Sequence, residues 1–457
     1  MRIVVTGIGK VGSTVAAYLS GESHEVVIVD QNPEVVERMT SHFDVLGVCG
    51  NGAALSVQKE AGIAKADLFI SLTSSDEFNI LSCIMAKKSG ARHVIARVRN
   101  PDYYQQMMFL REQLGLSMAI NPEMEAANAI SRMLRFPSAT KLELFAKGRL
   151  EMAEVTLPSD TFLDGLSLNR LGSSLGIQVL ICAVQRGDSV TIPTGDFVLH
   201  AGDHISITAS HSDMSEFFKK IGLYQDSVKS VMIVGGGTIA YYLAAQLLRL
   251  GMRVKIIEQN EATCEELSEK LPKAMILHGD GTDQELLEEE RIGSSDACVA
   301  LTGVDEENII VSMFAKTQKV KKVITKVNRA KLMMIMRSVG MESAISPRAV
   351  IGDRILRYVR ALSNSRTNAG GSSVQTLYRL LDGKMEALEF SVGENAPFTG
   401  KTLQELTFKK GVLIAGIVRE GRLIHPQGSD CMMPGDLVTV ITSIMGLNDL
   451  QDALMEG

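Results

Sequence analysis

Apolar residues in this chain fall in short runs, and stretches with the spacing of an amphipathic helix separate those runs. Helical spacing covers, for example, Val11–Leu19 and Glu34–Thr40. Strict alternation of strand and helix predicts a parallel sheet with right-handed crossovers, and six strands match a complete dinucleotide-binding sheet. The predicted strands are Ile3–Thr6, Val26–Asp30, Val45–Cys49, Leu68–Leu72, His93–Val98 and Met118–Ile120.

The same plan occurs a second time further along the chain. The predicted strands of this second copy are Val231–Val234, Val254–Glu258, Met275–His278, Ala297–Leu301, Val323–Val327 and Ala344–Ile345. Three more segments match between the copies: Leu72–Asn79 with Leu301–Asn308, Gly50–Gly52 with Gly279–Gly281, and Ile120–Pro122 with Ile345–Pro347. The chain is therefore a tandem repeat.

Short β-rich runs broken by Gly, Pro and Asp follow each sheet, and they predict a small α+β module. The pairs Gly202-Asp203 and Gly435-Asp436 are predicted to be hairpin turns. We therefore expect an α/β protein with two Rossmann-like parallel-sheet domains, each followed by a small α+β domain. The expected domain ranges are 1–135, 140–225, 229–360 and 374–457. The polar stretch Ser363–Ser373 is interpreted as a flexible linker or as a tolerated surface loop.

Each copy has a glycine-rich turn between its first strand and the next helix. In copy one, Gly7 permits a tight turn, Gly9 lets the backbone approach a pyrophosphate, and Gly12 allows close helix packing. The helix near Lys10 points free N–H groups at phosphates. Lys10 itself either neutralises a phosphate, of its own site or of one bound by a neighbouring subunit, or is a solvated lysine. Asp30 ends the second strand, where a carboxylate accepts hydrogen bonds from ribose hydroxyls and disfavours NADP.

Polar residues also follow the other strands of copy one, at the edge where open α/β sheets bind ligands. Thr73 and Ser74 follow the fourth strand, and Asn51, after the third, is expected beside an adenine. Arg97 ends the fifth strand and is expected to pair either with phosphate or with Asp67 or Asp76.

Copy two repeats the turn at a constant distance of 228 residues, from Gly7 to Gly235 and from Asp30 to Glu258. One such turn is weak evidence for nucleotide binding, but two in register are strong evidence. Ala240 replaces the third glycine, Asp280 replaces Asn51 and Lys326 replaces Arg97, so an altered affinity is expected.

Composition narrows the class of protein. The formal charge of −6 over 457 residues argues against the basic face that nucleic acids require. The six cysteines form no C-x-x-C pair and are expected to be buried thiols of a cytosolic protein. No metal site is expected, because a predicted turn separates His200 from His204. No apolar run reaches the roughly 20 residues that span a bilayer, so no direct membrane insertion is expected.

The modules of about 80 residues after each sheet contain no His–Asp or Lys–Asp arrangement in a polar cleft. A dehydrogenase needs such an acid or base beside its nicotinamide. Two nucleotide sheets without a catalytic domain favour a sensor, in which ligand binding selects one conformation over another.

The chain resembles the cytosolic, peripheral TrkA-type subunit of the bacterial Trk potassium-uptake system, a tandem of two regulator-of-K⁺-conductance (RCK) units. The resemblance covers nearly the whole chain. The motifs that carry it are Gly7–Gly12 with Asp30, Leu72–Asn79, Ala96–Arg99, Ile192–Gly195 with Gly202-Asp203, and His425–Gly428 with Gly435-Asp436.

The resemblance implies that NAD(H) and ATP/ADP bind the sheet domains. It also implies a homo-oligomeric ring, with a tetramer as the expected size, that docks on the inner face of the membrane and gates a TrkH/TrkG-type potassium translocator. No catalytic residue is implied. The residues carried over for the first site are Gly7, Ile8, Gly9, Lys10, Val11, Asp30, Thr73, Ser74 and Arg97, and for the second Gly235, Gly236, Gly237, Thr238, Ile239, Glu258, Thr302 and Lys326. An NAD-dependent oxidoreductase, or a redox sensor with another partner, is the alternative.

Overall fold

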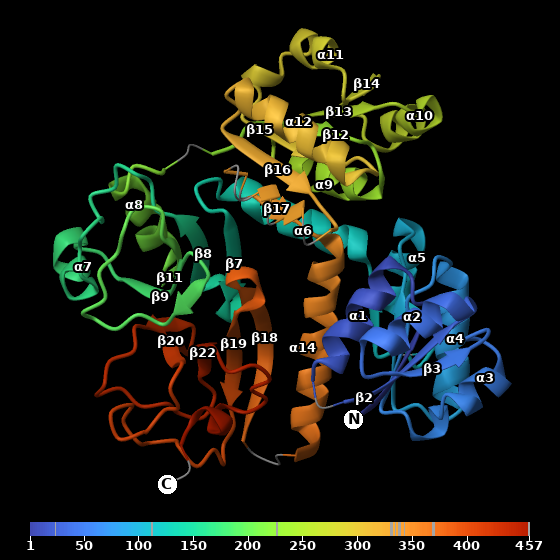
Figure 1. Ribbon diagram of the computed structural model, residues 1–457, viewed down its shortest axis with the longest axis horizontal. Coiled ribbons are helices and arrows are strands. Elements are labelled where there is room, and N and C mark those ends of the chain that lie inside the picture. Colours follow the sequence, from blue (N-terminus) through green and yellow to red (C-terminus); the bar gives the residue numbers. More distant parts are fainter. Residues whose placement is uncertain are drawn as a thin grey trace. The chain divides into compact units, whose positions relative to one another are not determined.

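Contacts divide the chain into two units in the computed structural model (Figure 1). The structure describes residues 1–22, 24–110, 113–224, 227–329, 332–333, 335–336, 340–341, 343–367 and 371–455. One unit consists of Met1–Ser131 with Lys229–Leu356, and the other of Arg132–Val228 with Arg357–Gly457. The first unit holds both parallel sheets and the second holds both small modules. The predicted α/β class, with a small module after each Rossmann-like sheet, is confirmed.

The first sheet (blue in Figure 1) has the strand order β3-β2-β1-β4-β5-β6, with all pairs parallel. The strand β1 lies inside the sheet, and its residues Ile3, Val4 and Val5 are buried. A strand covered on both faces requires such a continuous apolar run. The elements are β1 (Arg2–Thr6), α1 (Lys10–Ser20), β2 (Glu25–Asp30), α2 (Pro33–His42), β3 (Leu46–Cys49), α3 (Leu55–Glu60), β4 (Leu68–Ser71), α4 (Asp76–Lys88), β5 (His93–Arg97), α5 (Pro101–Leu110), β6 (Met118–Ile120) and α6 (Pro122–Arg135).

The second sheet (yellow-green to orange in Figure 1) repeats this order as β14-β13-β12-β15-β16-β17. Every predicted strand of both sheets is confirmed to within one residue at each end. The elements are β12 (Ser230–Val234), α9 (Thr238–Arg249), β13 (Arg253–Glu258), α10 (Glu261–Lys270), β14 (Met275–His278), α11 (Gln284–Glu289), β15 (Ala297–Ala300), α12 (Asp305–Thr317), β16 (Lys322–Lys326), β17 (Ala344–Ile345) and α14 (Pro347–Thr367).

Each small module contains a five-stranded antiparallel sheet, in the orders β10-β9-β11-β8-β7 and β18-β19-β22-β20-β21. The first module comprises β7 (Lys141–Phe145), β8 (Leu150–Thr156), α7 (Leu168–Leu175), β9 (Val179–Arg186), β10 (Ser189–Thr191), β11 (His204–Ala209) and α8 (His211–Lys220). The second comprises β18 (Ser372–Leu380), β19 (Met385–Val392), β20 (Val412–Arg419), β21 (Arg422–Ile424) and β22 (Leu437–Thr442). Phe145, Leu150, Leu380 and Ile441 belong to one buried cluster that joins the two modules.

The prediction that Gly202-Asp203 and Gly435-Asp436 form hairpin turns is wrong. Each pair precedes β11 or β22, whose neighbours in the sheet are not the strands before them in sequence. The two-residue hairpin loops lie elsewhere, between β9 and β10 and between β20 and β21.

Asp203 and Asp436 instead anchor arginines. Asp203 is 1% exposed and accepts two hydrogen bonds from Arg186, both of 2.7 Å. Asp436 is equally buried and accepts 2.9 and 2.8 Å bonds from Arg419. Each bidentate pair ties a hairpin strand to the turn before the central strand.

The predicted linker Ser363–Ser373 is mostly regular structure where it is described. The helix α14 continues to Thr367, and β18 begins at Ser372. Residues 368–370 of the predicted linker lie outside the described part of the chain. Asp449 fixes the second end, because its carboxylate accepts bonds from the Ser372 N–H (3.1 Å) and hydroxyl (2.9 Å).

We expect the Arg360–Glu386 pair to stabilise the unit that contains both modules. Its atoms lie 2.7 and 2.9 Å apart, and both residues are at most 1% exposed. Arg360→Leu should lower the free energy of unfolding by about 3–5 kcal/mol, because it leaves a buried carboxylate without its cation. Urea unfolding of the full chain measures this, with the exposed Arg422→Leu as the control.

The double variant Arg360→Met/Glu386→Leu should lose less stability than Arg360→Leu, since it leaves no buried charge unpaired. A single variant no less stable than the Arg422→Leu control would contradict the prediction.

Candidate functional site

The glycine turn of copy one has the geometry that close backbone packing requires. Gly7 has a φ of +82°, and a Cβ there would lie 2.7 Å from the backbone nitrogen of Thr73. A Cβ at Gly12 would lie 2.0 Å from the Gly7 carbonyl oxygen. Around Gly9, by contrast, no described residue beyond its chain neighbours places an atom within 4 Å of a Cβ position. The turn is therefore packed at its two ends and open at the glycine that would face a ligand.

Asp30 is bound to this turn. Its Oδ2 accepts a 2.7 Å bond from the Ile8 N–H, and its Oδ1 accepts a 2.9 Å bond from the Asn32 N–H. A carboxylate offers about four lone-pair positions, so both oxygens retain capacity for ribose hydroxyls. Asp30 therefore both fixes the turn and remains an acceptor.

The buried Asn79 holds the next two strand ends together. Its Oδ1 accepts bonds from the Thr73 N–H (2.8 Å) and hydroxyl (2.7 Å), and its Nδ2 donates to the Arg97 carbonyl (3.0 Å). Ser74 comes directly after Thr73 in the chain, at the same edge of the sheet. The Asn51 Oδ1 accepts a 2.9 Å bond from the Ala53 N–H, so part of its role is to shape its own loop.

Arg97 pairs with neither of the two acids proposed from the sequence. Its Nη2 lies 2.9 Å from Oε1 of Glu123, in the first turn of α6, and both side chains are mostly buried. The carboxylates of Asp67 and Asp76 are engaged elsewhere, since Asp67 accepts from the Arg2 N–H and Asp76 from the N–H groups of Arg99 and Asn100. The cation of Arg97 is thus already compensated within copy one.

Copy two reproduces the turn and its acid. Gly235 has a φ of +98°, and the space around Gly237 is open, as it is around Gly9. The Gly236 N–H donates a 2.6 Å bond to Glu258, whose other oxygen accepts from the Asn260 N–H at 2.8 Å. The longer acid therefore makes the same two bonds as Asp30. Thr238 and Ile239 begin α9, and Ala240, at the third-glycine position, is buried.

The remaining copy-two residues also have matched roles. Asn308 Oδ1 accepts a 2.7 Å bond from the Thr302 N–H, as Asn79 does from Thr73. Asp280 accepts bonds of 2.8 Å from the backbone and hydroxyl of Thr282, and the backbone bond in particular lowers the pKa of Asp280.

A cavity of about 800 Å³ within the first unit brings many of these residues together. Predicted site residues from copy one that line it are Gly7, Gly9, Lys10, Val11, Asp30, Thr73, Ser74 and Arg97, and those from copy two are Ile239 and Lys326. Predicted residues outside its lining are Ile8, Gly12, Asn51, Gly235, Gly236, Gly237, Thr238, Glu258, Asp280 and Thr302. The cavity therefore joins the first nucleotide turn to one edge of the second sheet.

Sequence reasoning missed two charged residues in this cavity, Glu123 and Arg348. Each follows the proline of a segment already matched between the copies, Ile120–Pro122 and Ile345–Pro347. The sequence signal for these residues was therefore the position after the matched proline, which holds an acid in one copy and a base in the other.

Neither a metal cluster nor a membrane-spanning helix is found within the part of the chain that the structure describes. No group of three or more His, Cys, Asp or Glu side chains there could hold a metal ion. His200 and His204, the two histidines considered in the sequence, each contact a carboxylate: His200 contacts Asp164 and His204 contacts Glu154. The nearby His211 contacts Glu151. None of the described helices is long and apolar enough to cross a bilayer.

Family models match both halves of the repeat. The TrkA-N domain matches residues 3–122 and 231–347, and the TrkA-C domain matches residues 152–222 and 387–455. The chain is 32% identical to Trk system potassium uptake protein TrkA homolog 1 of Methanosarcina mazei, over 99% of each chain. It is 34% identical to the TrkA homolog of Archaeoglobus fulgidus, over 94% of each chain.

A solved structure supports the fold. The GsuK channel bound to NAD superposes with a TM-score of 0.60 at 19% identity, and the match covers 96% of this chain and 76% of that one. Together with the doubled TrkA-N and TrkA-C matches, these likenesses show that the chain belongs to the TrkA family of Trk potassium-uptake proteins.

Proposed function

We propose that this protein is a regulatory subunit that binds NAD(H) and adenine nucleotides and gates a TrkH/TrkG-type membrane potassium translocator. The observation that carries the proposal is the doubled glycine turn, held by Asp30 in one copy and Glu258 in the other. A subunit of this kind is cytoplasmic and peripheral on the inner face of the membrane, and it is not an enzyme. We also propose the ranges 1–135, 140–225, 229–360 and 374–457 as its domains, because each family-model match falls inside one of them.

The open space beside Gly9 supports nucleotide binding at the first turn. Phosphates there would meet the N–H groups of the first turn of α1, which has no acidic residue to repel them. Asp30 would accept the adenosine ribose hydroxyls and repel a 2′-phosphate. The NAD-bound channel with the same fold supports the choice of NAD(H).

Contacts between the two sheet domains would allow a bound ligand to change how these domains are arranged. Asn121 lies between the end of β6 and Glu123 of the cavity, and its Nδ2 donates to the Arg99 carbonyl and to the hydroxyl of Tyr242 in α9 (2.9 Å). Gln246 of α9 donates a 2.7 Å bond to Asn128 of α6. Since α9 begins at the second glycine turn, a ligand at either turn touches an element of this contact. Binding that favours one arrangement by about 1–3 kcal/mol would change a partner's activity 5- to 150-fold.

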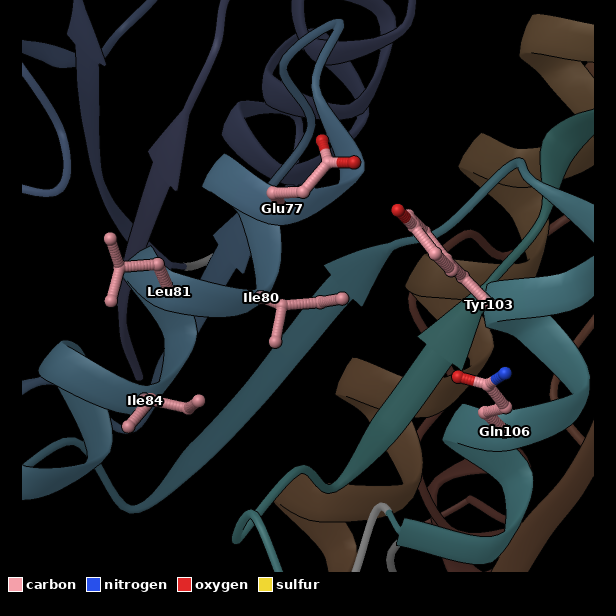
Figure 2. Close-up of a pocket in the computed structure, with 6 residues that line it drawn as sticks. All are labelled: Glu77, Ile80, Leu81, Ile84, Tyr103 and Gln106. Atoms are coloured by element: carbon pink, nitrogen blue, oxygen red, sulfur yellow. The ribbon is translucent and has the colours of Figure 1, made fainter.

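Matching apolar faces in the two copies support self-association into a ring, for which we propose a tetramer. Ile80, Leu81 and Ile84 of α4 line a mostly apolar pocket, together with Glu77 of the same helix and Tyr103 and Gln106 of α5 (Figure 2). Leu81 is 53% exposed. At an offset of 229 residues, Leu81 and Ile84 match Ile310 and Met313 of α12, which are 53% and 50% exposed. Because apolar groups recur at the same positions of both repeats, we propose that a second copy of this chain covers them.

Asp30→Ala should weaken NADH and ATP binding by about 10- to 100-fold, because charge-assisted hydrogen bonds contribute about 1.5–3 kcal/mol. Calorimetric titration with NAD⁺, NADH, ADP and ATP measures this in a Glu258→Ala background, which isolates the first site. Potassium uptake by cells that rely on the variant should fall in parallel, at unchanged protein level. The exposed Asp44→Ala is the matched control. Unchanged binding and uptake would show that the first site is not the sensor.

Purified protein should bind NADH without oxidising it across a panel of aldehydes, ketones and oxo acids. Absorbance at the nicotinamide band measures consumption. Turnover with any substrate would favour the alternative, an NAD-dependent oxidoreductase, over the regulatory function.

Leu81→Asp combined with Ile310→Asp should reduce the oligomer to smaller species, because each substitution places a charge in an apolar contact. Light scattering after size-exclusion chromatography measures the mass. Leu250→Asp is the control, since Leu250 is 50% exposed outside α4 and α12. An unchanged mass for the double variant would exclude these faces from the interface.

A further inference from the structure

The two copies differ in sign at one matched pair of residues. In copy one Arg97 ends β5 and pairs with Glu123 in the first turn of α6. The matched residues of copy two are Lys326, which ends β16, and Arg348, in the first turn of α14. The pair is neutral in copy one and carries two positive charges in copy two.

No carboxylate bonds to Lys326 or Arg348 among the residues that the structure describes. The Lys326 ammonium donates to the Leu301 carbonyl at 3.2 Å. Asp305 is the acid that acts on both cations, but its oxygens already accept from the Asn328 N–H (3.0 Å) and side chain (3.1 Å) and from the Arg329 N–H (3.1 Å). Asp76, the matching acid of copy one, accepts the same kind of backbone hydrogen bonds. Because both copies have this acid, Asp305 does not offset the extra positive charge of copy two.

The surroundings of Lys326 disfavour its charged form, and a bound anion would stabilise that form. Burial lowers the pKa of its ammonium, Asp305 raises it, and the positive charge of Lys10 from copy one lowers it again. Burial also lowers the pKa of the Arg348 guanidinium, against the opposing effect of Asp305. Partly buried like charges that act on one another are costly unless an anion joins them.

Both cations face the cavity that the first nucleotide turn lines. Lys326 and Arg348 share it with Gly9, Lys10 and Asp30. A nucleotide whose ribose meets Asp30 and whose first phosphate meets the Gly9 turn would extend its remaining phosphates into the same cavity. A volume of about 800 Å³ is within the range of known ligand sites.

We propose that Lys326 and Arg348 form a subsite for the terminal phosphate of a nucleoside triphosphate held at the Asp30 site. The inference rests on the proposed function and adds a ligand preference to it. In a dinucleotide the second phosphate is followed by the nicotinamide riboside, which would reach the same subsite with no further phosphate and, when oxidised, with a positive charge. ATP is therefore favoured over NAD⁺ by the second copy's residues, although the first copy holds the nucleoside.

The test measures affinities of ATP and NADH for the full chain and for Arg348→Glu, which restores the sign found in copy one. We expect ATP binding to weaken about 10-fold or more and NADH binding to change less than about twofold, since only ATP has a third phosphate to place there. Inorganic tripolyphosphate should compete with ATP on the wild-type chain and compete more weakly on the variant.

Lys273→Glu is the matched control, because it reverses an exposed charge of copy two outside the cavity. Arg348→Gln and Lys326→Gln should each weaken ATP binding in the same sense, and they decide the outcome if Arg348→Glu does not fold. ATP affinities equal to wild type in the folded variants would overturn the subsite while leaving the proposed function intact. A wild-type chain that binds neither ATP nor NADH would overturn both.

Discussion

The candidate nucleotide sites depend on one hydrogen bond in each copy, from a backbone N–H of the glycine turn to the acid that ends the next strand. That N–H lies beyond the strand ladder and before the helix, so it has no regular partner. Asp30 and Glu258 accept it at 2.7 and 2.6 Å. Their second oxygens accept from Asn32 and Asn260, which begin the next connection. A single carboxylate thus links the turn, the strand and the following helix.

A second device, Asn79 and Asn308, fixes the neighbouring edge. Each amide joins the ends of two strands through backbone groups, and both are fully buried. With the turn and this edge held in the same way, the two copies share one rigid scaffold. Differences between their sites therefore come from side chains placed on that scaffold, as at Lys326 and Arg348.

The strands could be predicted from the sequence because a parallel sheet buried on both faces requires continuous apolar runs. The turn and its acid were equally accessible, since their spacing is local and repeated. The hairpins of the modules were not, because the Gly202-Asp203 pair serves a distant partner, Arg186, that no local pattern reveals. The polar composition around Ser363 gave a wrong prediction of a linker or loop. The helix α14 continues through this segment, and Asp449 holds the start of the strand that follows.

The charged part of the cavity lay beyond sequence reasoning for a different reason. The pairing of Arg97 with Glu123 joins a strand end to a helix start, and their meeting depends on the fold of the whole sheet domain. Arg348 reaches the first nucleotide turn only because the two sheet domains share one cavity. The tandem repeat was visible in the sequence, but which residues of one copy face the other was not.

The sign reversal between Glu123 and Arg348 has a consequence for the origin of the single chain. Two identical subunits around a two-fold axis must present the same residue at both equivalent positions, so any change in one site is imposed on the other. Fusion of the two copies removes that constraint. One sheet can keep a neutral edge while its neighbour becomes cationic, and a nucleotide bound between them would contact a different set of charges on each side. The covalent link thereby allows the pair of sheet domains an asymmetry of charge that a symmetric pair of separate subunits cannot have.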